Sequence, residues 1–348
     1  MHSITGRKYE KGKKIGSGTF GTVYSVKRDD NRTFAFKEFE KEELGLDLGV
    51  LREISILKMI SGNKFNVMNL EDIIIEDDDE NTIGIIMKRY DLDLHDAIDK
   101  NILNRSNKRI IAKGILEAVY FLHENGIIHR DIKPENILLD KNINPVLADY
   151  TLSKVYTGVN KQGTHTSKIA TITYRAPEVI EKKPYGFPSD AWSVGVVFYE
   201  LFTNTHLKAK RDKEALDFLS TQIKKFNNNS TGDTVRGLLI TSPTNRWTIR
   251  KALSRMFNVV PNIPKMWIGI KSCRVSKDVK EMCELFEVEK KVTKWAAQTY
   301  VNRTKCTTQS AVELACKFYE TELYDYENEE YPEEEMQILM KMNYNLFI

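Results

Sequence analysis

Alternating apolar and polar residues mark the first quarter of the chain as strand-forming. The five predicted strands cover residues 9–15, 22–27, 33–39, 72–75 and 83–87. Asp29, Asp30 and Asn31 are typical of a tight turn between the second and third strands. The acidic stretch 76–80 is expected to be a solvated connection between the last two.

A helical pattern interrupts these strands over residues 48–59. Its apolar residues recur at i, i+4 and i+7 and form one stripe, made of Val50, Ile54 and Leu57. Glu53 lies in this otherwise apolar middle, where a carboxylate needs a cation. Lys37 on the third strand is the expected partner; an exposed surface glutamate is the alternative.

Helices are predicted to dominate from residue 92 onward. Residues 108–125 form an amphipathic pattern that Gly126 closes as a C′ residue. Pro261 and Pro264 mark a linker, after which a helical tail follows. The predicted tail helices cover residues 277–287, 291–303, 308–324 and 333–342.

The amino-acid composition limits the classes of protein to which the chain can belong. The chain has 348 residues, 41% hydrophobic and 29% charged, which is typical of a globular protein with one or two domains. A formal charge of +3 does not favour nucleic acid or an anionic membrane as a partner. The chain shows no apolar leader and no apolar run of membrane-spanning length, so an intracellular location, cytoplasmic or nuclear rather than secreted, is expected. The four cysteines match no CxxC pattern and are expected to be free buried thiols.

A glycine-rich segment joins the first two predicted strands. It reads Gly16-Ser17-Gly18-Thr19-Phe20-Gly21-Thr22-Val23. Glycines let backbone N–H groups approach phosphate oxygens because no Cβ stands in the way. In a Rossmann turn a helix follows such a string, whereas here a strand follows and Val23 completes the form GxGxxGxV. The segment predicts a phosphate-binding loop; a hairpin without a ligand is the alternative.

The third predicted strand carries a small residue and a lysine on one face. Ala35 and Lys37 share that face because side chains alternate with a period of two. A small residue there leaves room for an adenine base, and the lysine ammonium can reach phosphates. An isolated exposed lysine is the common alternative, but the spacing from Gly16 favours the nucleotide role.

One run of eight residues carries the groups that phosphoryl transfer requires. It reads His129-Arg130-Asp131-Ile132-Lys133-Pro134-Glu135-Asn136. Asp131 can accept a proton from an incoming hydroxyl, and Lys133 can neutralise charge on the transferred group. Asn136 offers an amide oxygen to a metal ion. A solvated charged loop without chemistry is the alternative.

Together these motifs resemble those of protein kinases, whose catalytic loop has His-Arg-Asp followed by Asn. The resemblance implies an α+β, bilobal fold: a five-stranded antiparallel sheet with one helix over residues 1–90, and a mainly helical lobe over 91–260. It also implies that Asp149, at the place of the kinase Asp-Phe-Gly, binds Mg²⁺ with Asn136. Tyr150 keeps the aromatic residue. Thr151 replaces the glycine and loses access to positive φ, which is expected to restrict rearrangement of this segment.

The resemblance further implies ATP as cofactor and names the residues that bind it. Met87 takes the gatekeeper position, and Lys88 stands where kinases usually carry an acidic residue. Adenine pairs with backbone at this hinge, so the departure is expected to matter little. The implied nucleotide-binding residues are Ile15, Gly16, Ser17, Gly18, Thr19, Phe20, Gly21, Val23, Ala35, Lys37, Met87, Lys88 and Tyr90.

Residues 51–58 and 171–178 resemble the cyclin-dependent kinases in particular. This resemblance places Thr166 at the activating phosphosite, where Arg130 and Arg52 would hold a phosphate. Thr171 would hydrogen-bond Asp131 and Lys133, and this combination favours Ser/Thr acceptors in protein substrates. A structural ion pair between Glu178 and Arg246 is also implied.

The tail, 261–348, is predicted to be a second module. Residues 314–320 and 335–346 resemble one cyclin box, and Lys317 and Glu335 would then contact the segment before Leu51. A kinase that carries its own activator is the resulting hypothesis, since the module would be present at high effective concentration. An unrelated helical extension remains the alternative for the tail. A pseudokinase scaffold that binds partners remains the alternative for the whole chain.

Overall fold

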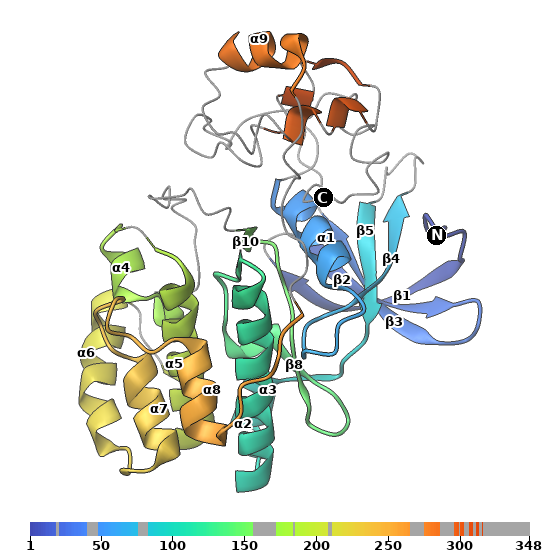
Figure 1. Cartoon of the computed structure of the whole chain (residues 1–348). Coiled ribbons are helices and arrows are strands. Elements are labelled where there is room, and N and C mark those ends of the chain that lie inside the picture. The colour runs from blue at the N-terminus through green and yellow to red at the C-terminus, as the bar shows by residue number, and fades with distance from the viewer. Residues whose placement is uncertain are drawn as a thin grey trace.

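The computed structural model describes residues 1–18, 21–39, 48–75, 83–155, 172–183, 185–207, 211–264, 275–285, 296–298, 300–302, 306–308, 311–312 and 315. A small lobe built on an antiparallel sheet joins a larger helical lobe (Figure 1). This confirms the bilobal α+β prediction.

The sheet of the small lobe contains five strands in the order β1-β2-β3-β5-β4, all paired antiparallel. The strands are β1 (Tyr9–Gly18), β2 (Gly21–Arg28), β3 (Thr33–Phe39), β4 (Leu70–Ile75) and β5 (Ile83–Lys88). β3 has the bounds that the sequence predicts. β1 continues three residues beyond its predicted end because Gly16, Ser17 and Gly18 still pair with β2. Part of the glycine-rich segment is therefore strand backbone.

One helix, α1 (Leu48–Ile60), packs in the small lobe beside the sheet (Figure 1). The predicted stripe of Val50, Ile54 and Leu57 is at most 1% exposed and belongs to the main hydrophobic core. Glu53 is also only 1% exposed. The sequence pattern thus identified the buried face, including the one carboxylate on it.

Helices make up most of the large lobe. They are α2 (Leu94–Asp99), α3 (Arg105–Glu124), α4 (Pro177–Ile180), α5 (Phe187–Thr203), α6 (Asp212–Gln222), α7 (Ser230–Leu238) and α8 (Ile249–Phe257). α3 begins three residues earlier than predicted because Asn104 and Asn107 form a capping box. Gly126 has φ +72°, which confirms its predicted position just beyond the helix end.

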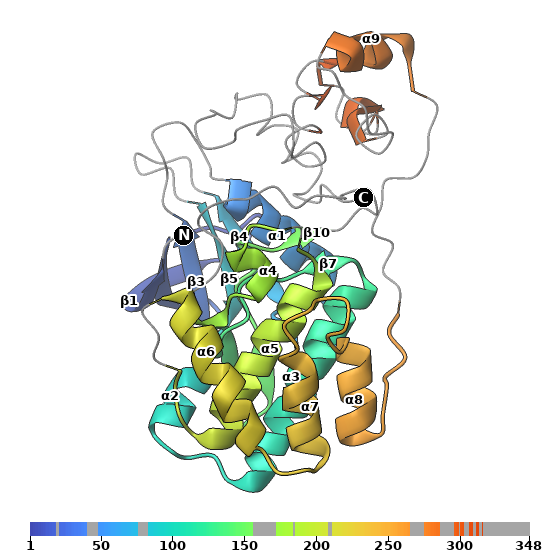
Figure 2. The same ribbon diagram turned by 90° about the vertical axis from the view of Figure 1, so that its left-hand side faces the viewer.

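Short strands and single 3₁₀ turns connect the helices of the large lobe. The strands are β6 (Leu92–Asp93), β7 (Ile127–Ile128), β8 (Ile137–Leu139), β9 (Pro145–Leu147) and β10 (Lys154–Val155), and the 3₁₀ turns are η1 (Pro134–Asn136), η2 (Ile172–Tyr174) and η3 (Ile223–Lys225). The β8–β9 hairpin pairs Ile137 with Leu147, and β10 pairs with β7. These pairings bring the segments around residues 131 and 149 together. α5 is buried almost throughout and forms the centre of the lobe (Figure 2).

Most of the described tail residues from 277 onward are helical. α9 (Lys277–Leu285) falls within the first predicted tail helix, and the helical residues 296–298 and 300–302 fall within the second. Cys283 is buried and Cys306 is half-buried, and both are free thiols. The two stretches that resemble a cyclin box lie outside the described residues, apart from the buried Ala315. Among the described helices, none combines the length and apolar character needed to cross a bilayer.

Candidate active site

The run that carries Asp131 is fixed in place by a buried carboxylate from α5. Asp190 is 1% exposed and accepts the backbone N–H groups of His129 (2.8 Å) and Arg130 (2.9 Å). His123 Nε2 lies 2.9 Å from the same carboxylate. Arg130 adopts φ +71°, a left-handed conformation that costs energy for a residue with a side chain. Asp190 therefore holds the loop in a strained conformation.

Asp131 lies at the centre of a small network of hydrogen bonds. Lys133 Nζ donates to Asp131 Oδ2 (2.7 Å), and Asn136 Nδ2 donates to the same oxygen (2.9 Å). Asn136 Nδ2 also donates to the backbone oxygen of Asp131 (2.8 Å). Because the amide nitrogen of Asn136 faces Asp131, its amide oxygen faces away and can bind another group. The structure thus brings together the three residues that the catalytic run predicts.

A second network joins the two lobes. Lys37 Nζ on β3 donates to Glu53 Oε2 on α1 (2.7 Å) and to Asp149 Oδ1 (3.2 Å). The Lys37 and Glu53 side chains are 11% and 1% exposed, so this ion pair is shielded from water. The predicted pairing of Lys37 with Glu53 is confirmed. The surface alternative for Glu53 is wrong, because α1 packs this face against the core.

Thr151 adds a group to this network that the sequence did not predict. Its hydroxyl can donate a hydrogen bond either to Glu53 Oε2, at 2.8 Å, or to Asp149 Oδ1, at 2.6 Å. The same hydroxyl oxygen accepts a hydrogen bond from Lys37 Nζ, at 3.1 Å. Thr151 does not have a positive φ, whereas Asp149 does (φ +63°). Threonine in place of glycine at position 151 therefore restrains the segment around Asp149 in two ways, through its side-chain hydrogen bonds and through its backbone.

Electrostatics keep the lysine and the aspartate charged. Burial lowers the pKa of Lys37, but Glu53 and Asp149 outweigh it and raise that pKa above the ordinary value. Burial raises the pKa of Asp149, yet Lys37 and the Thr151 hydroxyl bring it to about 2. Burial raises the pKa of Glu53, and the ion pair with Lys37 opposes that shift. At neutral pH the site therefore presents a cationic lysine beside an ionised Asp149.

The oxygen atoms of Asp149 and Asn136 suit Mg²⁺, which prefers carboxylate and amide oxygens. The Asn136 backbone oxygen accepts the N–H of Ala148 (2.9 Å). Asn136 and Asp149, the residue after Ala148, therefore lie at the same end of the β8–β9 hairpin. The hydrogen bonds of Asp149 with other described residues all use Oδ1, and its side chain is 35% exposed. Oδ2 of Asp149 and the amide oxygen of Asn136 are therefore the atoms that would hold the ion.

The predicted nucleotide-binding residues that the structure describes lie on β1, β2, β3 and β5 and just after β5. Among the described residues, a Cβ placed on Gly18 would meet no atom within 4 Å, and one on Gly16 would meet only the Val23 side chain, at 3.8 Å. This open space fits a phosphate that approaches the backbone. Ile15 is 38% exposed, so its apolar surface is available to a base, and Ala35 lies opposite Met87 in the sheet.

The remaining predicted binding residues lie along the same strands or beyond the described part. Ser17 and Gly21 lie beside the loop, and Lys88 ends β5 with its ammonium 5.1 Å from the Tyr90 ring. Burial raises the pKa of Tyr90 to about 12. The predicted site residues that lie outside the described residues are Thr19, Phe20, Thr166, Thr171, Lys317 and Glu335.

Comparison with known proteins gives the family. The family model described as "Protein kinase domain" matches residues 9–258, which is more than half of the chain. The chain belongs to the protein kinase family. Membership implies ATP as phosphoryl donor, usually with Mg²⁺, and protein substrates. The matched range contains both networks described above and ends at Asn258, the C-cap residue of α8.

The kinase domain also contains the predicted ion pair of the large lobe. Arg246 Nη1 and Nη2 donate to the two carboxylate oxygens of Glu178, at 2.7 and 2.9 Å, and both side chains are buried. Arg246 also donates to the backbone oxygens of Pro188 and Ile240. The pair thereby connects the start of α4 to the loop before α8. Its role is structural, as the sequence predicted.

Arg130 lies close enough to Arg52 for the two charges to interact. Burial lowers the pKa of Arg130, and the positive charge of Arg52 lowers it further, whereas Tyr185 and Asp190 raise it. Tyr185 packs under Arg130, with its ring 5.1 Å from the guanidinium carbon. Two cations held close together suit a doubly charged anion. The arrangement fits the predicted contact with a phosphorylated Thr166, which itself lies outside the described residues.

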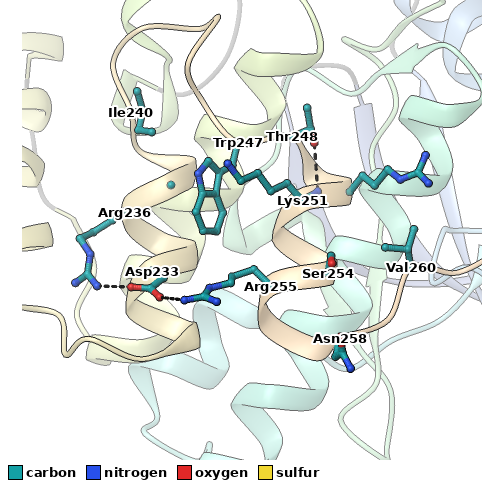
Figure 3. Close-up of a pocket in the computed structure, with 12 residues that line it drawn as sticks. Asp233, Arg236, Ile240, Trp247, Thr248, Lys251, Ser254, Arg255, Asn258 and Val260 are labelled. Carbon is teal, nitrogen blue, oxygen red and sulfur yellow. Dashed lines mark hydrogen bonds and ion pairs between the residues drawn. The ribbon is translucent and has the colours of Figure 1, made fainter.

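A separate pocket of about 1210 Å³ lies on the large lobe of the kinase, between α7 and α8 (Figure 3). Asp233 at its edge pairs with Arg236 and Arg255, both at 2.7 Å, and Lys251 lies 4.6 Å from the Trp247 ring. None of the residues that line it belongs to the networks around Asp131 or Lys37. The pocket is therefore distinct from the candidate active site.

Replacement of Asp190 by alanine is expected to destabilise the kinase domain by about 3–5 kcal/mol, because it removes a buried charge that holds His129 and Arg130. Chemical denaturation of the variant measures the loss. Asp233→Ala is the matched control, since Asp233 pairs near the surface with Arg236 and Arg255, whose side chains are 29% and 59% exposed, and solvent screening makes its loss much smaller. Equal losses for the two variants would contradict the anchoring role of Asp190.

Proposed function

We propose that this kinase is a serine/threonine protein kinase of the cyclin-dependent-kinase type. It transfers the γ-phosphate of Mg-ATP to Ser or Thr hydroxyls of protein substrates. The observation that carries the proposal is the joined network of Lys37, Glu53 and Asp149 opposite Asp131. An active kinase needs this lysine–glutamate pair and this aspartate in place at the same time.

The chain's own residues would carry the transfer through position and charge. Lys37 would hold the phosphates at the inner end of β3, and a bound Mg²⁺ would neutralise charge between them. Asp131 would orient the incoming hydroxyl and accept its proton, with Lys133 beside it to stabilise negative charge on the transferred group. Asn136 keeps Asp131 in this orientation through its amide nitrogen.

The assembled side chains favour an enzyme over a pseudokinase scaffold. A scaffold needs no ionised Asp149, no buried Lys37–Glu53 pair and no proton acceptor at Asp131. All of these are present and held by hydrogen bonds. The preference for Ser/Thr over Tyr rests on Lys133, which lies 2.7 Å from Asp131, together with the predicted role of Thr171.

The test is incubation with γ-labelled ATP, Mg²⁺ and a generic basic protein, followed by identification of the labelled amino acids. We expect label on serine and threonine. Label on tyrosine would contradict the proposed specificity, and no transfer from a correctly folded protein would contradict the enzyme proposal.

The tail is proposed to activate the kinase in cis as a cyclin-like module. α1 carries Glu53, and both views place the described pieces of the tail on the same side of the molecule as α1 (Figures 1 and 2). A partner that packs on α1 keeps Glu53 on Lys37, and a tethered partner is present at high effective concentration.

Removal of residues 261–348 is therefore expected to lower phosphoryl transfer by at least about tenfold, which corresponds to ~1.4 kcal/mol of lost coupling between tail and active site. Initial rates of the full chain and of the truncated chain, measured at equal concentrations of folded protein, check this. Addition of the tail as a separate chain should restore part of the activity. Full activity of the truncated kinase would contradict activation in cis.

A further inference from the structure

We propose that His95, Asp99 and His206 form a binding site for a divalent transition metal ion of the zinc type, outside the candidate active site. One ligand atom from each of these residues lies within 4.8 Å of the others. His95 and Asp99 lie one turn apart on α2, and His206 lies just beyond α5. Two imidazoles and a carboxylate are ligands that Zn²⁺ accepts.

The two histidines direct equivalent nitrogens at the carboxylate. Nε2 of His206 lies 3.3 Å from Asp99 Oδ1, and Nε2 of His95 lies 3.8 Å from Asp99 Oδ2. With Zn–N and Zn–O bonds of about 2.0–2.2 Å, ligand atoms of a tetrahedral site lie about 3.3–3.5 Å apart. The first distance already has this value. The second requires the His95 ring, which stacks on the His206 ring with centroids 4.1 Å apart, to turn toward the ion, and its 38% exposure leaves it room to do so.

A buried carboxylate fixes the ring of His206 for this role. Glu200 is 0% exposed, accepts the backbone N–H of Leu207 (2.7 Å) and the hydroxyl of Tyr174 (3.1 Å), and lies 3.3 Å from His206 Nδ1. A carboxylate acceptor at Nδ1 favours the tautomer that carries its proton there and its lone pair on Nε2. Metal-binding histidines commonly have such a carboxylate partner.

Nε2 of His206, the nitrogen that faces the proposed ion, is buried and makes no hydrogen bond with the described residues. The carboxylate oxygen 3.3 Å away, Asp99 Oδ1, is itself a proposed ligand. A buried polar atom without a hydrogen bond costs energy, and a metal bond would remove that cost. Asp99 is 64% exposed, so solvent provides a path for the ion and a water molecule can complete the coordination.

Metal binding would fasten α2 to the end of α5. His206 lies more than 100 residues after His95 and Asp99 in the chain, so the ion would join two distant segments. Glu135 in η1, next to Asn136, has Oε1 3.9 Å from His95 Nδ1. The ion would thus stabilise the packing of α2 beside the catalytic loop without contacting Asp131. Its expected role is structural.

The test uses the full-length protein without an affinity tag, stripped of metal and titrated with Co²⁺ and then Zn²⁺ in excess Mg²⁺. Excess Mg²⁺ occupies oxygen sites such as that around Asp149. We expect one Co²⁺ per chain, with the visible absorption of a low-coordinate nitrogen–oxygen site, displaced by Zn²⁺. Zn²⁺ should also raise the melting temperature.

Asp99→Asn and His206→Ala are expected to lower the affinity by at least tenfold and to abolish the absorption and the temperature shift. Asp99 is exposed, so Asp99→Asn should fold normally and keep the metal-free melting temperature. His2→Ala, at the far end of the chain, is the control and should bind like the wild type. A wild type without Co²⁺ absorption, or equal binding by Asp99→Asn, would overturn the proposal.

Discussion

Lys37→Met is expected to lower kcat/KM for phosphoryl transfer by about 10²–10³-fold, the effect typical of removing one preorganised electrostatic group. The same change leaves Glu53, 1% exposed, next to Asp149 without their shared cation. Breaking a buried ion pair from one side costs about 3–5 kcal/mol. Steady-state rates and urea unfolding of the same preparation measure the two losses separately.

Lys11→Met provides the matched control. Lys11 on β1 pairs across β2 with Glu38 on β3 at 2.6 Å, but its side chain is 34% exposed. Solvent screens such a pair, so its loss is expected to cost under about 1 kcal/mol and to leave activity nearly unchanged. A Lys37→Met protein that keeps wild-type activity while Lys11→Met loses it would contradict the assignment of Lys37.

Thr151→Val is expected to lower kcat by about tenfold or more and stability by about 1–3 kcal/mol. Valine keeps the shape of threonine but removes the hydroxyl that lies 2.8 Å from Glu53 and 2.6 Å from Asp149. A hydrogen bond to a charged group contributes about 1.5–3 kcal/mol. Asp149 would also lose part of its lowered pKa, to which the hydroxyl contributes. Rates at saturating ATP and thermal unfolding check both effects.

Two other substitutions separate the hydroxyl from the backbone. Thr151→Ser keeps the hydroxyl and is expected to retain most activity. Thr151→Gly removes it and also frees the backbone, so it should lose at least as much stability as Thr151→Val. If Thr151→Val behaves like Thr151→Ser, the hydroxyl does not hold the network.

A site residue can be predicted from the sequence when the pattern that reveals it lies within a short stretch of the chain. Glu53 was predicted because a charged residue interrupts a clear apolar stripe, and such an interruption requires a buried partner. Asp131, Lys133 and Asn136 were predicted because they lie within one short run. Their mutual hydrogen bonds follow from the turn at η1.

The groups that the sequence missed act across long separations. Asp190 lies 61 positions after His129, so its two backbone hydrogen bonds cannot be read from spacing. At Thr151 the sequence shows only that threonine replaces the glycine usual in kinases. Its hydroxyl can bind Glu53, 98 positions earlier in the chain, because the fold brings α1 next to it. The pairing of His206 with Asp99 depends in the same way on the fold, which brings the segment after α5 beside α2.

The central claim is that Asp131 and the Lys37 network form an active site for phosphoryl transfer. The most direct measurement compares the wild type with Asp131→Asn in one experiment, recording both Mg-ATP affinity and initial rate of γ-phosphate transfer to protein. We predict ATP affinity within about threefold of the wild type and a rate lower by about 10²–10⁴-fold, since the proton acceptor is lost. An Asp131→Asn protein that transfers phosphate at the wild-type rate would contradict the account.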